Sequence, residues 1–160
     1  MEMQNAIKLL EASMQKYEQQ GSDIATAIFE IMQQKKVTGL YITGSGPNAG
    51  TAMQAALIMS ETTKLCFTGL PLAQYVRGPK ETAENSIVIN IIAKGKSYDR
   101  TQKSATTITA AGAHVFTVEE PGATENESVL HNIIPFNFMA FHLSKKLKVD
   151  TIFALGGKVT

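Results

Sequence analysis

Hydrophobic residues recur every three or four positions near the start of the chain, which is the spacing of one face of an α-helix. One apolar stripe covers residues 3–17 and a second covers residues 24–32. Gly21 can end the first helix, and Ser22 can cap the second. We therefore expect two helices within residues 1–36. They would pack on the core or contact a partner subunit.

Short apolar runs alternate with helical patterns in the rest of the chain. The run at 86–92 is almost continuously apolar, as in a central parallel strand covered on both faces. Alternating strands and helices predict an α/β fold, a three-layer, doubly wound, mostly parallel sheet of the flavodoxin-like type. Residues 37–160 would form a single domain behind the helical extension of residues 1–36. The five expected strands are 40–43, 65–68, 86–92, 114–118 and 133–134, with helices at 48–63, 72–76, 99–112 and from Pro135 onward, and a loop at 121–128.

Composition narrows the class of protein. The chain has 160 residues, 44% of them hydrophobic and 18% charged, and a net charge of +1 without a long basic run, so nucleic acid is not expected as the main partner. No apolar stretch reaches membrane-spanning length, and the N-terminus lacks a signal-peptide pattern, so we expect a cytoplasmic protein. The single cysteine, Cys66, is predicted to be a buried strand residue. His114 and His142 are predicted core residues, and no residue cluster has metal-ligand spacing.

A glycine-rich loop, residues 44–50, follows the first predicted strand and leads into a helix. Ligands of open parallel sheets sit beyond the carboxyl ends of the strands, where this loop lies. Backbone N–H groups and the positive end of the helix dipole favour an anion there. The candidate ligand-binding residues of the loop are Gly44, Ser45, Gly46, Asn48 and Thr51.

Two common phosphate loops fit this sequence poorly. The loop lacks the Gly-Lys-Ser/Thr ending of a P-loop, and it matches GxGxxG only in the looser form that has Ala49 at the third glycine. The next strand ends in Thr68-Gly69, where a dinucleotide-binding fold places an acidic residue. A nucleotide site and a purely structural turn remain alternatives.

Other candidate residues lie outside the loop. Lys94, Lys96 and Ser97 follow the strongest strand, so they should border the same crevice and could hold phosphate, although two solvated lysines in a turn would look the same. Arg77 is a further candidate anion ligand. Glu61 lies near the end of the helix at 48–63, where the helix dipole disfavours a charged carboxylate. If partly buried, Glu61 could carry a proton in catalysis; otherwise it is an ordinary exposed glutamate.

Several of these segments together resemble the sugar isomerase (SIS) domain family. The resemblance runs from residue 37 to residue 160 and is to the second SIS unit in the isomerase half of glucosamine-6-phosphate synthases. Its motifs follow the family order and spacing, with a late helix segment and a tail that also resemble the family. They are Tyr41-Ile42-Thr43-Gly44-Ser45-Gly46, Ala55-Ala56-Leu57, Ser60-Glu61, Arg77-Gly78-Pro79, Ala140-Phe141-His142 and Val149-Asp150.

The resemblance implies roles for individual residues. Glu61 matches the family glutamate that moves a proton between C1 and C2 of the sugar. Arg77 stands where the synthase has a histidine that assists ring opening, although an arginine stays protonated at neutral pH. Lys158 lies one place from the position of the near-terminal catalytic lysine. Residues 93–98 replace the Ser-x-Ser-Gly-x-Thr phosphate loop of typical SIS domains.

The resemblance also implies a ligand and a partner. The ligand would be a small-molecule sugar phosphate, with no cofactor and no metal. Two SIS units pack together in the synthase and share their sites, which implies a homodimer here or pairing with a second SIS-domain chain. The leading hypothesis is a phosphosugar aldose–ketose isomerase. The alternative is a non-catalytic phosphosugar-binding or regulatory subunit.

Overall fold

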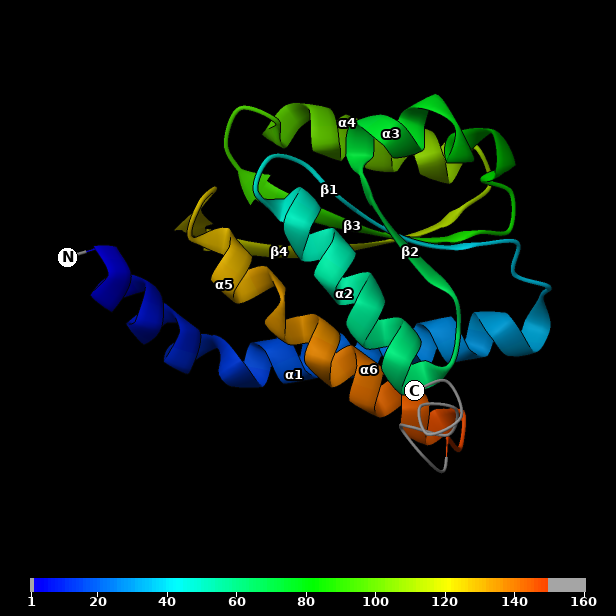
Figure 1. Cartoon of the computed structure of the whole chain (residues 1–160), viewed down its shortest axis with the longest axis horizontal. Coiled ribbons are helices and arrows are strands. Elements are labelled where there is room, and N and C mark those ends of the chain that lie inside the picture. Colours follow the sequence, from blue (N-terminus) through cyan, green and yellow to red (C-terminus); the bar gives the residue numbers. More distant parts are fainter. Residues whose placement is uncertain (1, 150–160) are drawn as a thin grey trace, which may run out of the picture.

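The computed structural model describes residues 2–149, which form a parallel sheet between two layers of helices (Figure 1). The strands are β1 (Leu40–Gly44), β2 (Phe67–Pro71), β3 (Ile87–Lys94) and β4 (His114–Thr124), in the spatial order β2-β1-β3-β4. Every neighbouring pair is parallel. This arrangement confirms the three-layer, doubly wound fold.

The helices divide between the two faces of the sheet (Figure 1). One layer contains four of them: α1 (Glu2–Gln34), α2 (Asn48–Thr63), α5 (Ser128–Asn132) and α6 (Ile134–Lys146). The opposite layer contains α3 (Leu72–Arg77), the short 3-10 helix η1 (Pro79–Thr82) and α4 (Tyr98–Ala110). We refer to them as the α1–α6 layer and the α3–α4 layer.

The central strand is the one that the sequence marks most strongly. Residues 87–93 of β3 are all buried, because β3 has a neighbour on each side and helices over both faces. The larger apolar cluster lies beneath the α1–α6 layer and includes Ile28, Ile89 and Phe136. A smaller cluster beneath the α3–α4 layer includes Tyr75 and Ile108.

The N-terminal segment is one helix and not the expected pair. Gly21 lies inside α1, where a β-carbon would come within 2.6 Å of the Pro135 carbonyl oxygen and 2.7 Å of the Phe138 β-carbon. The glycine therefore permits α1 and α6 to approach closely, which a larger side chain would prevent. Its function is in packing and not in helix termination.

The predicted stripe of residues 3–17 is only partly buried. Tyr17 is buried, but Ile7 and Met14 are 48% and 39% exposed. The buried face of this half of α1 is carried instead by Ala6, Ser13 and Tyr17. The stripe thus leaves two large apolar side chains on the surface of the chain.

The sheet has four strands where five were expected. Residues 133–134 lie at the junction of α5 and α6, with Pro135 in the first turn of α6. Proline is tolerated there because the first N–H groups of a helix have no partner within it. The apolar pair Ile133-Ile134 therefore belongs to the junction between two helices and does not form a strand.

Three smaller expectations also change. Cys66 is exposed, because β2 begins one residue later, at Phe67. β4 continues through Pro121 to Thr124, part of the expected loop; proline is tolerated there because β4 is an edge strand. His114 and His142 are half-buried, whereas His131 is fully buried.

No helix within residues 2–149 is both long and apolar enough to cross a lipid bilayer.

Candidate functional site

The strand order creates a topological switch point at the carboxyl ends of β1 and β3. The chain leaves β1 toward α2 in one helical layer and leaves β3 toward α4 in the opposite layer. The connections therefore diverge between two neighbouring strands, which is where open α/β sheets bind ligands. The loop of residues 44–47 and the loop of residues 94–97 flank this point. We refer to it as the switch-point crevice.

The glycine loop folds as a tight turn that leads directly into α2. Gly46 has a φ of +55°, a left-handed conformation that favours glycine. The amides of Asn48 and Ala49 donate to the carbonyls of Ser45 and Gly46, both at 3.1 Å. The turn therefore lies at the positive end of the α2 dipole.

Hydroxyl groups bring the two loops together. The Thr101 hydroxyl, on α4, donates to the Ser97 carbonyl at 2.8 Å and lies 3.5 Å from Ser45 Oγ. Beneath them, buried Asn90 accepts from the Thr43 hydroxyl at 2.9 Å and donates to the Thr101 carbonyl at 3.2 Å. This buried amide fixes β1, β3 and the start of α4 relative to one another.

Two predicted ligand residues of the glycine loop are buried. Asn48 is 1% exposed; its Nδ2 donates to Ser128 Oγ at 2.7 Å and its Oδ1 accepts from Asn132 Nδ2 at 3.3 Å. Thr51 is buried one turn further along α2. These contacts show Asn48 anchoring the loop to α5. By contrast, Lys94 and Lys96 are exposed, and Ser97 is half-buried.

A carboxylate that the sequence did not single out occupies the crevice. A β-carbon on Gly46 would lie 2.9 Å from Glu125 Oε1, and one on Gly95 would clash with the same carboxyl group. Glu125 follows β4, so its side chain reaches both flanking loops from the neighbouring edge strand. No local sequence signal relates Glu125 to these glycines, because only the sheet brings them together.

A buried polar cluster joins α1, β4 and α5. The Tyr17 hydroxyl donates to Glu120 Oε2 at 2.8 Å and contacts His131 Nδ1 at 2.9 Å. Since that hydroxyl has only one proton to donate, the His131 ring donates to it through Nδ1. Lys16 pairs with Glu120 at 2.9 Å, and the Gly122 amide donates to the other Glu120 oxygen at 2.9 Å.

The environment shifts the pKa values of this cluster. Burial lowers the pKa of His131, partly opposed by the nearby carboxylates of Glu120 and Glu127. Burial alone would raise the pKa of Glu120, but hydrogen bonds from Lys16, Gly122 and Tyr17 bring it below its usual value. Burial and the Glu120 carboxylate raise the pKa of Tyr17. The cluster therefore holds a neutral imidazole against an ionised carboxylate.

The predicted catalytic residues are not gathered at the crevice of this chain. Glu61 is exposed near the far end of α2, 13 positions after Asn48, or roughly 20 Å at the rise of an α-helix. Arg77 is exposed at the end of α3. Lys158 and the resembling segment at Asp150 lie outside the described residues. Within residues 2–149, no three His, Cys, Asp or Glu side chains form a metal-binding group.

Several solved structures share this fold. The C-terminal domain of glucosamine-fructose-6-phosphate aminotransferase from Francisella tularensis superposes with a TM-score of 0.79 at 14% identity, over 93% of this chain and 45% of that chain. Glucosamine-6-phosphate deaminase from Thermotoga maritima gives 0.62 at 16% identity, over 83% and 43%. Tagatose-6-phosphate ketose/aldose isomerase from Escherichia coli gives 0.53 at 16% identity, over 81% and 40%.

These likenesses confirm the SIS-type fold predicted from the sequence. The chain spans less than half the length of each of these three structures. No protein-family model matches the sequence, and no curated protein matches it significantly.

Proposed function

We propose that the switch-point crevice binds the phosphate of a phosphorylated sugar, which would make this chain a phosphosugar-binding SIS domain. The observation that carries the proposal is the convergence of two loops at the switch point of the sheet, one opening α2 and the other bearing Lys94 and Lys96. The positive end of the α2 dipole and the lysine ammonium groups both favour a phosphate. The three fold relatives above are named for enzymes of phosphosugars, which supports this ligand class.

The direct test is calorimetric titration of the full chain with fructose 6-phosphate. Lys94→Gln with Lys96→Gln should weaken binding about tenfold or more, since each lysine offers a charge-assisted hydrogen bond. Lys35→Gln with Lys36→Gln removes the same charge from exposed positions at the end of α1 and should leave the affinity unchanged. An equal loss of affinity in both double variants would show that Lys94 and Lys96 act only through the net charge of the chain.

Glu125 should compete with the phosphate for the crevice. Its carboxylate lies against Gly46 and Gly95, so a bound anion must displace it or share the space with it. Glu125→Gln removes the charge at nearly constant shape, and we expect roughly fivefold tighter binding of fructose 6-phosphate, from about 1 kcal/mol of repulsion. Glu11→Gln, which removes the same charge from an exposed position of α1, is the control. Tighter binding in the control, or none in Glu125→Gln, would contradict this role.

We propose isomerisation as the chemistry, with Glu61 as the group that takes the C2 proton and returns it to C1 through an enediol. The separation of roughly 20 Å along α2 means that Glu61 cannot serve the crevice of its own chain. Glu61 would instead serve the crevice of a second subunit, together with Arg77 and Lys158 as candidate site residues.

A homodimer would supply that second subunit. Ile7 and Met14 are exposed on α1, and Met53, Leu57 and Phe141 are exposed on α2 and α6 of the same layer. Burial of such side chains drives association. Ile7→Glu with Met14→Glu should shift a dimer to monomer in light scattering after size-exclusion chromatography. A wild-type chain that is monomeric at high concentration would instead favour a separately encoded SIS partner.

The second candidate function is a non-catalytic phosphosugar-binding subunit. The exposure of Glu61 and its distance from the crevice favour it. Interconversion of fructose 6-phosphate and glucose 6-phosphate separates the two functions. Turnover that Glu61→Gln abolishes, with binding retained, supports the isomerase. Binding without turnover, in the wild-type chain and with any SIS partner added, supports the regulatory subunit.

A further inference from the structure

A second hollow lies in the α3–α4 layer, between α3 and η1 on one side and α4 on the other. It has a volume of about 310 Å³, at the lower end of the range of small-molecule sites. One wall comes from α3 and η1 through Val76 and Lys80, and the other comes from α4. None of its lining residues belongs to the loops at 44–50 or 94–97. We refer to it as the α3–α4 groove.

Positive charge from two elements meets in the α3–α4 groove. Lys80 lies on η1, and Arg100 and Lys103 lie three positions apart on α4, so both project from one side of the helix. Neither Arg100 nor Lys103 forms a salt bridge within residues 2–149. Lys80 reaches Glu81 only at 4.0 Å, and since the Glu81 side chain is exposed the pair contributes little energy.

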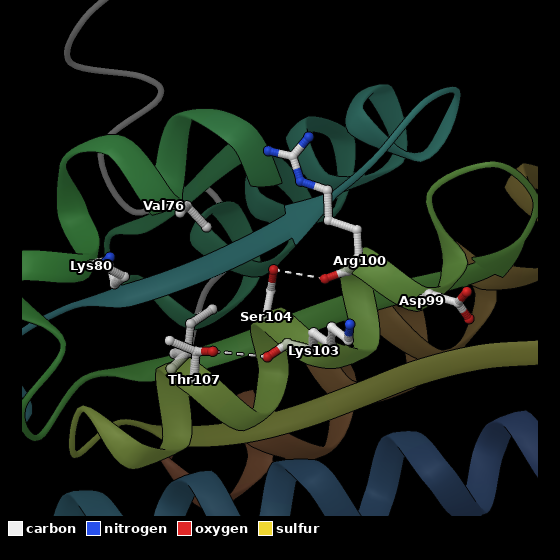
Figure 2. Close-up of a pocket in the computed structure, with 8 residues that line it drawn as sticks. Val76, Lys80, Asp99, Arg100, Lys103, Ser104 and Thr107 are labelled. Atoms are coloured by element: carbon white, nitrogen blue, oxygen red, sulfur yellow. Dashed lines mark hydrogen bonds between the residues drawn. The ribbon is translucent and has the colours of Figure 1, made fainter.

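The one carboxylate of the lining does not neutralise these cations. Figure 2 shows the Asp99 side chain on the side of α4 away from Val76 and Lys80, while the Arg100 side chain extends in a different direction. Asp99 lies in the first turn of α4, where the helix dipole favours a negative charge. Its position is therefore explained by the helix, and within residues 2–149 it forms no salt bridge with Arg100 or Lys103, so the lining carries three cations against one carboxylate.

The remaining lining residues add two kinds of surface. The Ser104 hydroxyl donates to the Arg100 carbonyl at 2.8 Å, and the Thr107 hydroxyl donates to the Lys103 carbonyl at 3.0 Å (Figure 2). With their protons engaged, both oxygens can only accept, so they suit a ligand that carries hydroxyl donors. Val76 contributes apolar surface, which suits the flat face of a ring, and the fully buried Ile108 lies beneath it.

We propose that the α3–α4 groove is a second ligand site, for a phosphate ester that carries hydroxyl groups and an apolar ring face. Lys80, Arg100 and Lys103 bind the phosphate, Ser104 and Thr107 accept from ligand hydroxyls, and Val76 contacts the ring. A nucleoside monophosphate combines all three features. This site stands independently of the function proposed for the switch-point crevice.

The test is calorimetric titration of the full chain with AMP, with fructose 6-phosphate and inorganic phosphate as parallel probes. AMP binding should weaken tenfold or more in Arg100→Gln with Lys103→Gln. It should persist in Lys94→Gln with Lys96→Gln, which alters the other site, and in Lys35→Gln with Lys36→Gln, which matches the lost charge. All of the substituted side chains are exposed on helices or loops, so the fold should be retained, and circular dichroism checks this. Lys80 is not substituted in this test.

The parallel probes identify which part of the ligand the groove recognises. If fructose 6-phosphate loses affinity in Arg100→Gln with Lys103→Gln as AMP does, the groove is supported as a site for hydroxylated phosphate esters in general. AMP affinity that is equal in the wild-type chain and in this variant would overturn the proposal. So would the absence of AMP binding at millimolar concentration, or AMP binding lost only in Lys94→Gln with Lys96→Gln.

Discussion

The two helical layers of this protein cover the same sheet by different means. The α1–α6 layer places long helices over the larger apolar cluster and leaves several large apolar side chains on its outer surface. The α3–α4 layer covers a smaller cluster with α3, η1 and α4, and its surface carries cations and hydroxyl groups around a groove. Under the proposals above, one layer would supply most of the stability and a surface for a partner, and the other would supply a surface for ligands. The switch-point crevice lies between them.

The largest test of this contrast is truncation of the core in each layer. Phe136→Ala, fully buried beneath the α1–α6 layer, should cost about 3–5 kcal/mol of unfolding free energy. Ile108→Ala should cost less, about 2–3 kcal/mol, because Ile108 borders the α3–α4 groove, where the surroundings can relax. Urea denaturation followed by circular dichroism measures both.

Phe141→Ala, on the same helix as Phe136, is the control for the first substitution. Its side chain is 54% exposed, so its loss should change the unfolding free energy of the monomer by about 0.5 kcal/mol or less. Equal losses of unfolding free energy for Ile108→Ala and Phe136→Ala would contradict the expected difference in stability between the two layers.

A smaller effect is expected from the close approach of α1 and α6. Gly21→Val should destabilise the chain by about 1–3 kcal/mol, because the added side chain meets the backbone of α6. Gly50→Ala, in a helical glycine of α2 with open space around it, should stabilise the chain by about 0.5–1 kcal/mol. Thermal denaturation of both variants compares the two glycines. Equal tolerance at both positions would contradict the packing role of Gly21.

The smallest effect concerns pH and is confined to the α1–α6 layer. The folded-state pKa of His131 is lowered by burial, so the unfolded chain binds more protons at mildly acidic pH. Stability should therefore fall as the pH drops below about 6.5, the ordinary pKa of histidine, and stay level above it. For one proton the slope cannot exceed about 1.4 kcal/mol per pH unit.

His131→Gln should flatten the unfolding free energy between pH 5 and pH 7, measured by urea denaturation at each pH. His142→Gln, on α6, should preserve the slope of the wild-type chain. Below pH 5 a further loss is expected in every variant, because Glu120 has a lowered pKa in the folded chain and its ionised form is stabilised there. If His131→Gln leaves the slope of unfolding free energy against pH unchanged, another group is responsible for the pH dependence.

Local pattern was sufficient for much of the fold. The apolar run of β3 predicted a central strand because burial on both faces removes the polar alternation of a surface strand. The glycine loop predicted the turn between β1 and α2, since Gly46 adopts a positive φ there. Pattern failed at residues 133–134, because a short apolar pair fits a helix as well as a strand.

The sequence by itself determined the alternation of strands and helices, the central strand β3 and the glycine loop that follows β1. Each of these depends on residues that are adjacent in the chain. The tertiary structure decided what required residues distant in the chain to meet. It placed Gly21 against α6 and the Glu125 carboxylate against both Gly46 and Gly95. It also separated Glu61 from the crevice by the length of α2. These outcomes depend on strand order and helix length in space, which no local pattern of residues encodes.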